Sequence, residues 1–228
     1  MGHTVGCVSR TGLEPASLSA VRYTRRRRAG RQEHRRPPPL RLHGQVSAQP
    51  TLRTERLILR PFAEDDAPDI QRLAGEREVA DTTLRVPHPY PDGAATIWIV
   101  ESAFAWETGK GASYAITDAE SGDLLGAIGL AIAPEHAYAE MGYWIGREYW
   151  NRGLCTEAAR AVLELAFDSL SLHRVQARHF TRNAASGRVL QKVGMHFEGM
   201  QRDAVRKWGR FEDIALYAIL EDEWRSAM

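Results

Sequence analysis

The sequence predicts a mixed α/β (α+β) domain, with a central, mostly antiparallel twisted sheet of about seven strands and about four flanking helices. Three short apolar runs lie between residues 113 and 145, and their short connections are typical of antiparallel neighbours. A strand–helix–strand pattern follows over residues 138–179, and such a crossover places its two strands parallel in one sheet. Two last runs, 195–202 and 211–220, surround a turn and extend the sheet.

Each expected element begins or ends at a residue with a physical reason to be there. Pro61 stands at the end of the first strand, where no backbone donor is needed, and the three prolines of residues 82–92 require a loop. Gly109 and Gly194 follow helical patterns as stop signals, and Asn183 stands at a helix N-cap position. In chain order, the expected elements are a strand at 56–62, a helix from Glu64 through Val79, a helix at 94–108, strands at 113–117, 124–132 and 138–145, a helix after Gly153, a strand at 173–179, a helix at 183–193, and strands at 195–202 and 211–220.

Charge divides the chain of 228 residues into two parts, although its net charge is only +1. Residues 1–48 hold ten arginines and two acidic residues, a net charge of +8, whereas the 20 basic and 27 acidic residues of 49–228 give −7. Few apolar residues and much like charge predict a disordered Arg/Pro-rich tail at 1–48, before a single folded domain at 49–228. We favour a plain solvated tail. A nucleic-acid-binding arm and an organelle transit peptide are the alternatives.

Cysteines, histidines and hydropathy argue against several classes of protein. Cys7 and Cys155 do not form a disulfide framework, which favours a reducing compartment, the cytoplasm. The eight histidines show no metal-ligand spacing, so we expect no metal. No window approaches 18 consecutive apolar residues, so we expect no membrane span. Nothing in the sequence decides between a monomer and a homodimer.

The chain is organised around residues 137–160, which predict a strand, a turn and a helix. The strand carries one acidic residue, Glu140, among apolar and small neighbours. The helix begins at or near Gly153, where the first N–H groups lack intrahelical partners and the helix dipole is positive. Such a turn binds anions, so an acid beside it indicates an enzyme that holds a phosphorylated cofactor against a basic substrate.

From Thr54 onward the chain resembles the GNAT acyltransferases, and more narrowly the RimJ/RimL-type N-acetyltransferases. The matching blocks are TERLILRP at 54–61, EMGYWI at 140–145, YWNRGLCTEA at 149–158, AFDSL at 166–170 with HRV at 173–175, NAASGRVLQKVGM at 183–195, EGM at 198–200, and Asp213 with Tyr217. The resemblance implies a GNAT-like sheet with a splayed parallel pair at the cofactor site. It also implies acetyl-CoA as the donor and a primary amine as the acceptor.

The resemblance maps the cofactor onto the central stretch. It implies a pantetheine arm paired with the open strand edge at Tyr143, Trp144 and Ile145, where one N–H also faces the thioester oxygen. It implies a pyrophosphate bound by the backbone amides of Arg152, Gly153, Leu154, Cys155 and Thr156. The chain departs from the family pattern at Trp150, where Gln or Arg is usual, and at Cys155, where Gly or Ala is usual. Both departures affect side chains more than amides.

Acetyl transfer needs a base for the amine, donors for the oxyanion and an acid for the departing thiolate. Glu140 is the candidate base, acting directly or through a water; the alternative is a structural carboxylate paired with an arginine. Many acetyltransferases of the superfamily place a tyrosine, the acid, four residues before the glycine that ends the second helix, and here that residue is Leu190. We therefore name Ser186 as the acid, with solvent as the alternative proton source. Asn183, one helical turn earlier, either holds the pantetheine arm or only caps its helix.

The favoured function, by resemblance, is direct acetyl transfer from acetyl-CoA to a protein N-terminal α-amine of the ribosomal-protein type. An α-amine has a free pKa of about 7.7–8.0, below the value of about 10.4 for lysine, so it is easier to deprotonate. A small amine, such as a polyamine, an amino acid or an antibiotic, is the alternative within the enzyme class. A non-catalytic nucleic-acid- or ribosome-binding module with an Arg-rich tail is the alternative from another class.

Overall fold

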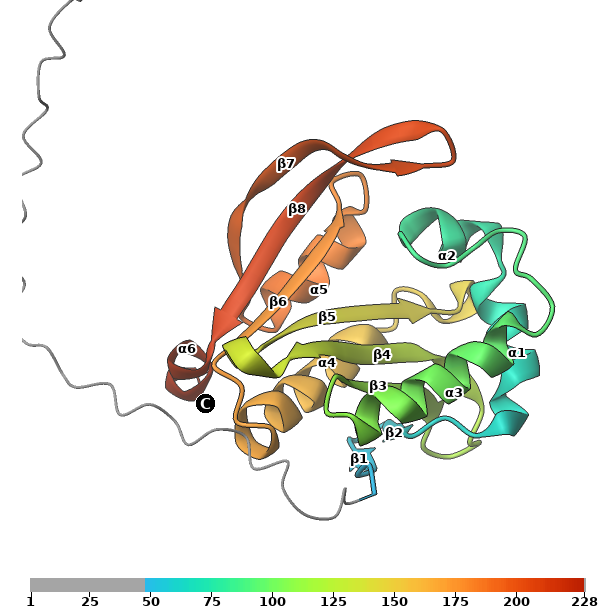
Figure 1. The fold of residues 1–228 in the computed structure, drawn as a ribbon, viewed down its shortest axis with the longest axis horizontal. Helices are drawn as coiled ribbons and strands as arrows, with labels where there is room; N and C mark the ends of the chain where they lie inside the picture. Colours follow the sequence, from blue (N-terminus) through green and yellow to red (C-terminus); the bar gives the residue numbers. More distant parts are fainter. Residues whose placement is uncertain (1–47, 228) are drawn as a thin grey trace, which may run out of the picture. The chain divides into compact units, whose positions relative to one another are not determined.

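The structure, a computed structural model, describes residues 48–227, so the predictions for residues 1–47 lie outside the described part (Figure 1). Its helices are α1 (Ala67–Ala74), α2 (Arg77–Thr82), α3 (Ala94–Glu107), α4 (Leu154–Glu164), α5 (Ala184–Lys192) and α6 (Glu221–Ser226). Its strands are β1 (Leu52–Arg53), β2 (Leu57–Arg60), β3 (Gly111–Asp118), β4 (Leu124–Ala133), β5 (Tyr138–Ile145), β6 (Arg174–Phe180), β7 (His196–Lys207) and β8 (Arg210–Leu220).

The strands form one sheet in the order β1-β2-β3-β4-β5-β6-β8-β7. Every neighbouring pair is antiparallel except β5 and β6, which α4 connects as a parallel crossover. The predicted mixed, mostly antiparallel fold with one parallel pair is thereby confirmed. The sheet has eight strands because residues 52–53 add the short β1 at its edge.

The parallel pair is the feature that positions the site. Tyr138–Met141 of β5 pair with Arg174–Ala177 of β6, and the pairing stops there. From residue 142 to 145, β5 has β4 as its only strand neighbour among residues 48–227, while β6 continues beside β8. Figure 1 shows β5 and β6 diverging from this point, with α4 behind them and α5 beside β6. One edge of β5 is therefore open over its last four residues.

The two faces of the sheet are covered by different helices. Tyr114 and Ile116 of β3 contribute to a core that also contains the apolar face of α4. Ala115, between them, contributes to a second core with buried residues of α1 and α3. This alternation follows from the two-residue period of a strand. The sheet is consequently a middle layer, with α4 on one face and α1 and α3 on the other (Figure 1).

Three parts of the chain differ from expectation. The expected helix from Glu64 to Val79 is two helices, because α1 is capped at Gly75 and Glu76 then leaves helical geometry with a ψ of 134°. The last hairpin is longer than predicted, since β7 continues to Lys207 through two register irregularities. The short helix α6 was not expected at all. Within residues 48–227, no helix is long and apolar enough to cross a membrane.

Candidate active site

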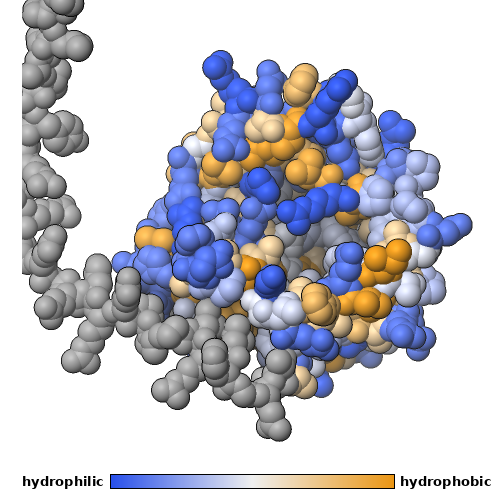
Figure 2. Space-filling model, viewed as in Figure 1, coloured by the Kyte–Doolittle hydropathy of each residue, from blue (hydrophilic) through white to orange (hydrophobic). Residues whose placement is uncertain are grey.

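A cleft of about 930 Å³ lies where β5 and β6 diverge. Figure 2 shows the corresponding face of the molecule hollowed near its centre, with hydrophobic and hydrophilic side chains side by side around the hollow. The sequence-predicted site residues all line this cleft: Glu140, Tyr143, Trp144, Ile145, Arg152, Gly153, Leu154, Cys155, Thr156, Asn183 and Ser186. The fold thus brings together residues from β5, the start of α4 and the start of α5, whose individual roles stay predictions.

The open edge of β5 forms one wall of the cleft. Tyr143, Trp144 and Ile145 pair with β4 on one side and face the cleft on the other. Trp150 donates an indole hydrogen bond to the carbonyl of Ile145 at 2.7 Å, so the departure from the family pattern noted at this position has a structural use. Because a strand edge presents unpaired N–H and C=O groups, this wall can accept an extended chain of amides as an added strand.

The N-terminus of α4 forms the adjoining wall. Gly153 is the N-cap with φ of 77°, a left-handed conformation that glycine adopts without strain. The Thr156 N–H donates back to the Gly153 carbonyl at 3.1 Å, whereas the N–H groups of Leu154 and Cys155 precede the first intrahelical bond, so the turn can hold an anion. Arg56 braces it from outside by donating to the carbonyl of Arg152 at 3.1 Å and, through its guanidinium, to the carboxylate of Glu157 at 2.6 and 2.8 Å.

The Glu157 carboxylate holds the Arg56 guanidinium in place as an ionised group. Burial alone would raise the pKa of Glu157, but hydrogen bonds from Thr54 and Arg56 outweigh it and lower that pKa. Cys155, by contrast, has no charge-stabilising partner, and burial raises the pKa of its thiol. The Cys155 thiol is therefore neutral at physiological pH and is a poor nucleophile, which leaves its backbone amide as the useful group.

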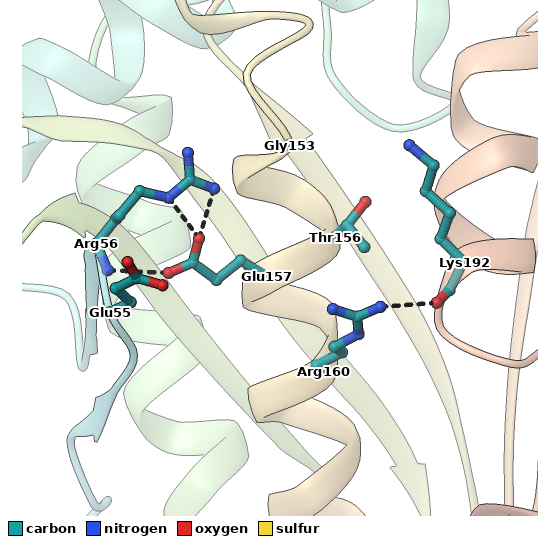
Figure 3. A pocket seen from close by; sticks show the side chains of 7 residues that line it. All are labelled: Glu55, Arg56, Gly153, Thr156, Glu157, Arg160 and Lys192. Carbon is teal, nitrogen blue, oxygen red and sulfur yellow. Dashed lines mark hydrogen bonds and ion pairs between the residues drawn. The ribbon is translucent and has the colours of Figure 1, made fainter. Parts of the chain in front are cut away.

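A second, smaller hollow of about 410 Å³ adjoins the α4 turn. It is lined by Glu55, Arg56, Gly153, Thr156, Glu157, Arg160 and Lys192 (Figure 3). In Figure 3, Thr156 and Lys192 point toward the N-terminal end of α4, and Arg160 donates to the carbonyl of Lys192 at 3.2 Å. Sequence analysis missed Arg160 and Lys192. The signal that could have found Arg160 is its position one helical turn after Thr156, on the same face of α4.

Glu140 has a different environment from the one its chain neighbours suggested. Its carboxylate accepts from Arg178 at 2.9 Å and from Gln176 at 3.4 Å, and its side chain is 26% exposed. The surrounding is thus polar, and the arginine pair considered as the alternative is present. Arg174, Gln176 and Arg178 alternate on β6, a polar stripe that could have predicted this partner. The pair does not exclude a role as base, because Glu140 still lines the cleft.

Ser186 lies at the start of α5 and has two neighbours that fix its place. Asn183 caps the helix by accepting from the Ser186 N–H at 3.2 Å, which confirms the predicted N-cap. Tyr143 reaches across the gap between β5 and α5, and its hydroxyl lies 2.8 Å from the Ser186 Oγ. Leu190, where many relatives have a tyrosine, is fully buried in the core.

The Tyr143 side chain packs against the core and also carries a hydroxyl that bonds across the gap. Burial raises the pKa of its hydroxyl, and the hydrogen bond with Ser186 opposes that rise without outweighing it. The phenol is therefore neutral at physiological pH and can donate. Its one proton goes either to the Ser186 Oγ, at 2.8 Å, or to the Ser186 carbonyl, at 3.2 Å, and in the second case the serine hydroxyl donates to the phenol. In both cases a protonated hydroxyl pair stands beside the open edge of β5.

Comparison with known proteins identifies the family that shares this arrangement of strands and helices. Residues 56–196 match the family model of the acetyltransferase (GNAT) domain. The uncharacterized N-acetyltransferase YoaA of Bacillus subtilis (strain 168) is 32% identical over 173 residues, which are 75% of this chain and 97% of the relative. The [ribosomal protein uS5]-alanine N-acetyltransferase of Escherichia coli (strain K12) is 24% identical over 182 residues, 76% of this chain and 92% of the relative.

A solved structure shares the fold at low sequence identity. The Mycobacterium smegmatis RimJ in complex with CoA-disulfide superposes with a TM-score of 0.67 at 23% identity, and the match covers 76% of this chain and 87% of that one. The splayed strands, the crossover helix and the family match over most of the folded part agree with one another. This chain therefore belongs to the GNAT family, as a RimJ/RimL-like N-acetyltransferase that uses acetyl-CoA.

Proposed function

We propose that this N-acetyltransferase moves the acetyl group directly from acetyl-CoA to the N-terminal α-amine of a protein. The observation that carries the proposal is that the open β5 edge, the α4 N-terminus, Glu140 and Ser186 all line one cleft. A donor held along β5 and α4 and an amine beside Glu140 can therefore meet without an acyl-enzyme step. The neutral, partly buried thiol of Cys155 supports direct transfer.

The donor is held in two places. The pantetheine amides pair with the backbone of Tyr143, Trp144 and Ile145, and Asn183 faces the same arm from the start of α5. The pyrophosphate binds the amides of residues 152–156, where the α4 dipole favours negative charge. Lys192, exposed beside that turn, adds positive charge to the phosphate end.

The reaction then needs three groups. The amine gives its proton to the Glu140 carboxylate, directly or through a water, and its nitrogen attacks the thioester carbon. An N–H of the β5 edge stabilises the oxyanion of the tetrahedral intermediate. When the intermediate collapses, the newly formed C–N bond remains and the C–S bond breaks. The CoA thiolate takes a proton from the Ser186 hydroxyl, solvent then restores that proton, and Glu140 releases the amine proton to solvent.

An α-amine suits this site better than a lysine side chain. With a free pKa of about 7.7–8.0, an α-amine is partly neutral at physiological pH, whereas lysine is almost wholly protonated. The alanine N-acetyltransferase activity that names the Escherichia coli relative supports the same acceptor class. The free Cys155 agrees with a reducing compartment, and we place the reaction in the cytoplasm.

A screen of acceptors tests the proposal. CoA thiol release is measured with the full chain, acetyl-CoA, and three sets of amines: peptides with free N-termini, polyamines and aminoglycosides. We expect an alanine-starting peptide to give the highest kcat/KM, and the same peptide with a blocked α-amine to be inactive even if it contains lysine. A polyamine or aminoglycoside that exceeds every peptide would replace the proposed acceptor by a small amine. RNA binding by the full chain, without transfer to any amine, would favour the binding-module alternative.

A further inference from the structure

Residues 81–87 form part of the cleft wall without belonging to the sheet. They run from the end of α2 into the proline-containing loop, and residues 82–87 all line the cleft, beside Trp98 and Glu101 of α3. These residues lie apart from the β5 edge and the α4 turn that we assign to the donor. A loop that lines a cleft with no strand partner needs other contacts to hold its backbone in place.

Lys207, at the tip of the β7–β8 hairpin, supplies one such contact. Its ammonium donates to the carbonyl of Val86 at 2.9 Å and to that of Leu84 at 3.4 Å, across more than a hundred residues of sequence. Lys207 is only 7% exposed, and within the described part of the chain no ion pair joins it to a carboxylate. Burying an ammonium is costly unless its donors are used, so these two carbonyls are its stabilising partners.

The neighbouring side chains strengthen the same contact. The Lys207 ammonium lies 5.0 Å from the ring centroid of Trp208, and the Arg77 guanidinium of α2 lies 5.3 Å from that centroid. The ring of His88, in the loop, lies 5.8 Å from the Trp208 ring. Figure 1 shows the hairpin tip reaching toward α2 above the diverging strands. The hairpin tip is thus docked on α2 and on the loop that follows it.

Arg182 holds the other end of the loop. Its guanidinium donates to both carboxylate oxygens of Asp81, at 2.7 and 3.2 Å, to the Asp81 carbonyl at 2.7 Å, and to Glu212 of β8 at 2.9 Å. The next residue, Asn183, donates to the carbonyl of Thr82 at 3.5 Å. Four carbonyls of residues 81–86 are thereby held by side chains from two other segments, the connection between β6 and α5 and the β7–β8 hairpin.

We propose that Lys207 and Arg182 are positioning residues that fix residues 81–87 as the acceptor wall and so determine acceptor recognition. This rests on the proposed function in one respect, that the amine enters beside this wall. The Lys207 ammonium contacts none of the groups that we assign to acetyl-CoA, whereas Arg182 directly precedes Asn183, which we place beside the pantetheine arm. Removing the Lys207 ammonium therefore displaces the wall and weakens acceptor binding, while the donor site stays intact. If these contacts served only to stabilise the fold, their loss would lower the free energy of unfolding and change the KM values for both substrates alike.

The first test uses Lys207→Met, which keeps the aliphatic chain and removes the donors. Arg206→Met is the matched control, because Arg206 is exposed on the same hairpin and bonds only within it, at Gly209. Limited trypsin digestion with mass analysis follows cleavage after Arg85, which is exposed in the loop. We expect cleavage after Arg85 to be about tenfold faster in Lys207→Met than in wild type or Arg206→Met, because a released loop opens locally far more often.

The second test is kinetic, with the alanine-starting peptide as the probe. Lys207→Met should raise the KM for the peptide about tenfold and leave the KM for acetyl-CoA within about twofold. Asp81→Asn, a milder change at a half-buried residue, should shift the same constants in the same direction, and it keeps the proposal testable if Lys207→Met does not fold. Unchanged cleavage after Arg85, or an equal rise in both KM values, would overturn the proposal. The digestion needs no acceptor, so its result stands even if the peptide fails as a substrate and the proposed function with it.

Discussion

The hydroxyl of Tyr143 lies 2.8 Å from the Oγ of Ser186, and this contact links the open edge of β5 to the first turn of α5. When the phenol donates to Oγ, the serine hydroxyl is free to donate into the cleft. When the serine donates to the phenol instead, it is not. The tyrosine thus controls the direction of the proton that we assign to the departing thiolate, in a chain where the more usual tyrosine position is occupied by the buried Leu190.

Tyr143→Phe keeps the ring and removes this control. A neutral hydrogen bond contributes about 0.5–1.5 kcal/mol, so we expect kcat to fall about threefold to tenfold. The KM for acetyl-CoA should change little, because the β5 backbone remains. Steady-state kinetics of Tyr143→Phe, Ser186→Ala and the double variant give a cycle. If the two hydroxyls act together, the double variant is scarcely slower than Ser186→Ala; multiplied losses would show that they act separately.

Glu140→Gln should lower kcat about 10²–10⁴-fold, the usual contribution of a general base, with acetyl-CoA affinity near that of wild type. Binding of acetyl-CoA by calorimetry and steady-state rates measure both effects. An undiminished rate would remove Glu140 from the mechanism.

Arg178→Met separates the base from the ion pair. Arg178 is 38% exposed, and a pair of this kind contributes only about 0–1 kcal/mol to stability, so the variant should fold normally. If Glu140 acts as the base, Arg178→Met keeps its carboxylate and most of the rate. Equal losses in Arg178→Met and Glu140→Gln would show that the pair itself is what matters.

Local features of this fold could be predicted because each has a local cause. The span of β5, the helix start at Gly153 and the N-cap at Asn183 depend on alternation, glycine freedom and a side-chain acceptor, and the structure confirms all three. The splay of β5 from β6 was expected only through the resemblance, since no pattern along either strand marks the residue where pairing stops.

Contacts between distant residues could not be predicted in the same way. Glu140 meets Arg178 from 38 positions away, and Lys207 meets Val86 from 121 positions away. Periodicity states which face a side chain occupies but not which other segment lies opposite. The apolar neighbours of Glu140 along its strand therefore suggested a dry pocket, whereas its actual environment is set by the strand beside it.

Acid should weaken the fold through the pair of Asp66 and Arg60. Asp66 is 6% exposed and accepts two hydrogen bonds from Arg60, at 2.7 and 2.8 Å, and one from the Ala63 N–H. Burial alone would raise the pKa of Asp66, but these bonds outweigh it and lower that pKa. A carboxyl whose pKa is lower in the folded state stabilises the fold above its unfolded pKa of about 3.9, and that contribution is lost as the pH falls toward the folded value.

Asp66→Asn tests this at neutral pH, where it should cost about 1–3 kcal/mol because the partly buried hydrogen bonds from Arg60 and from the Ala63 N–H lose their charged acceptor. Urea unfolding at pH 7 and at pH 3 measures the difference. The difference in the free energy of unfolding between wild type and variant should be smaller at pH 3, since wild-type Asp66 is then becoming protonated. A gap that stays constant would assign the loss to packing instead of charge. Asp65→Asn, on an exposed neighbour, is the control.

Gly153 and Gly122 offer a matched pair for the anion site at the start of α4. Both have left-handed backbones, with φ of 77° and 80°, and an added Cβ would be free of close contacts at either one. Alanine at either position should therefore cost a similar amount of stability, about 1–2 kcal/mol from backbone strain.

Of these two glycines, only Gly153 lines the cleft, where a methyl group would stand between the α4 amides and a phosphate. We expect Gly153→Ala to weaken CoA binding by at least about tenfold, and Gly122→Ala to leave it unchanged, as measured by calorimetric titration with CoA. Equal affinities in the two variants would show that phosphate does not approach this turn.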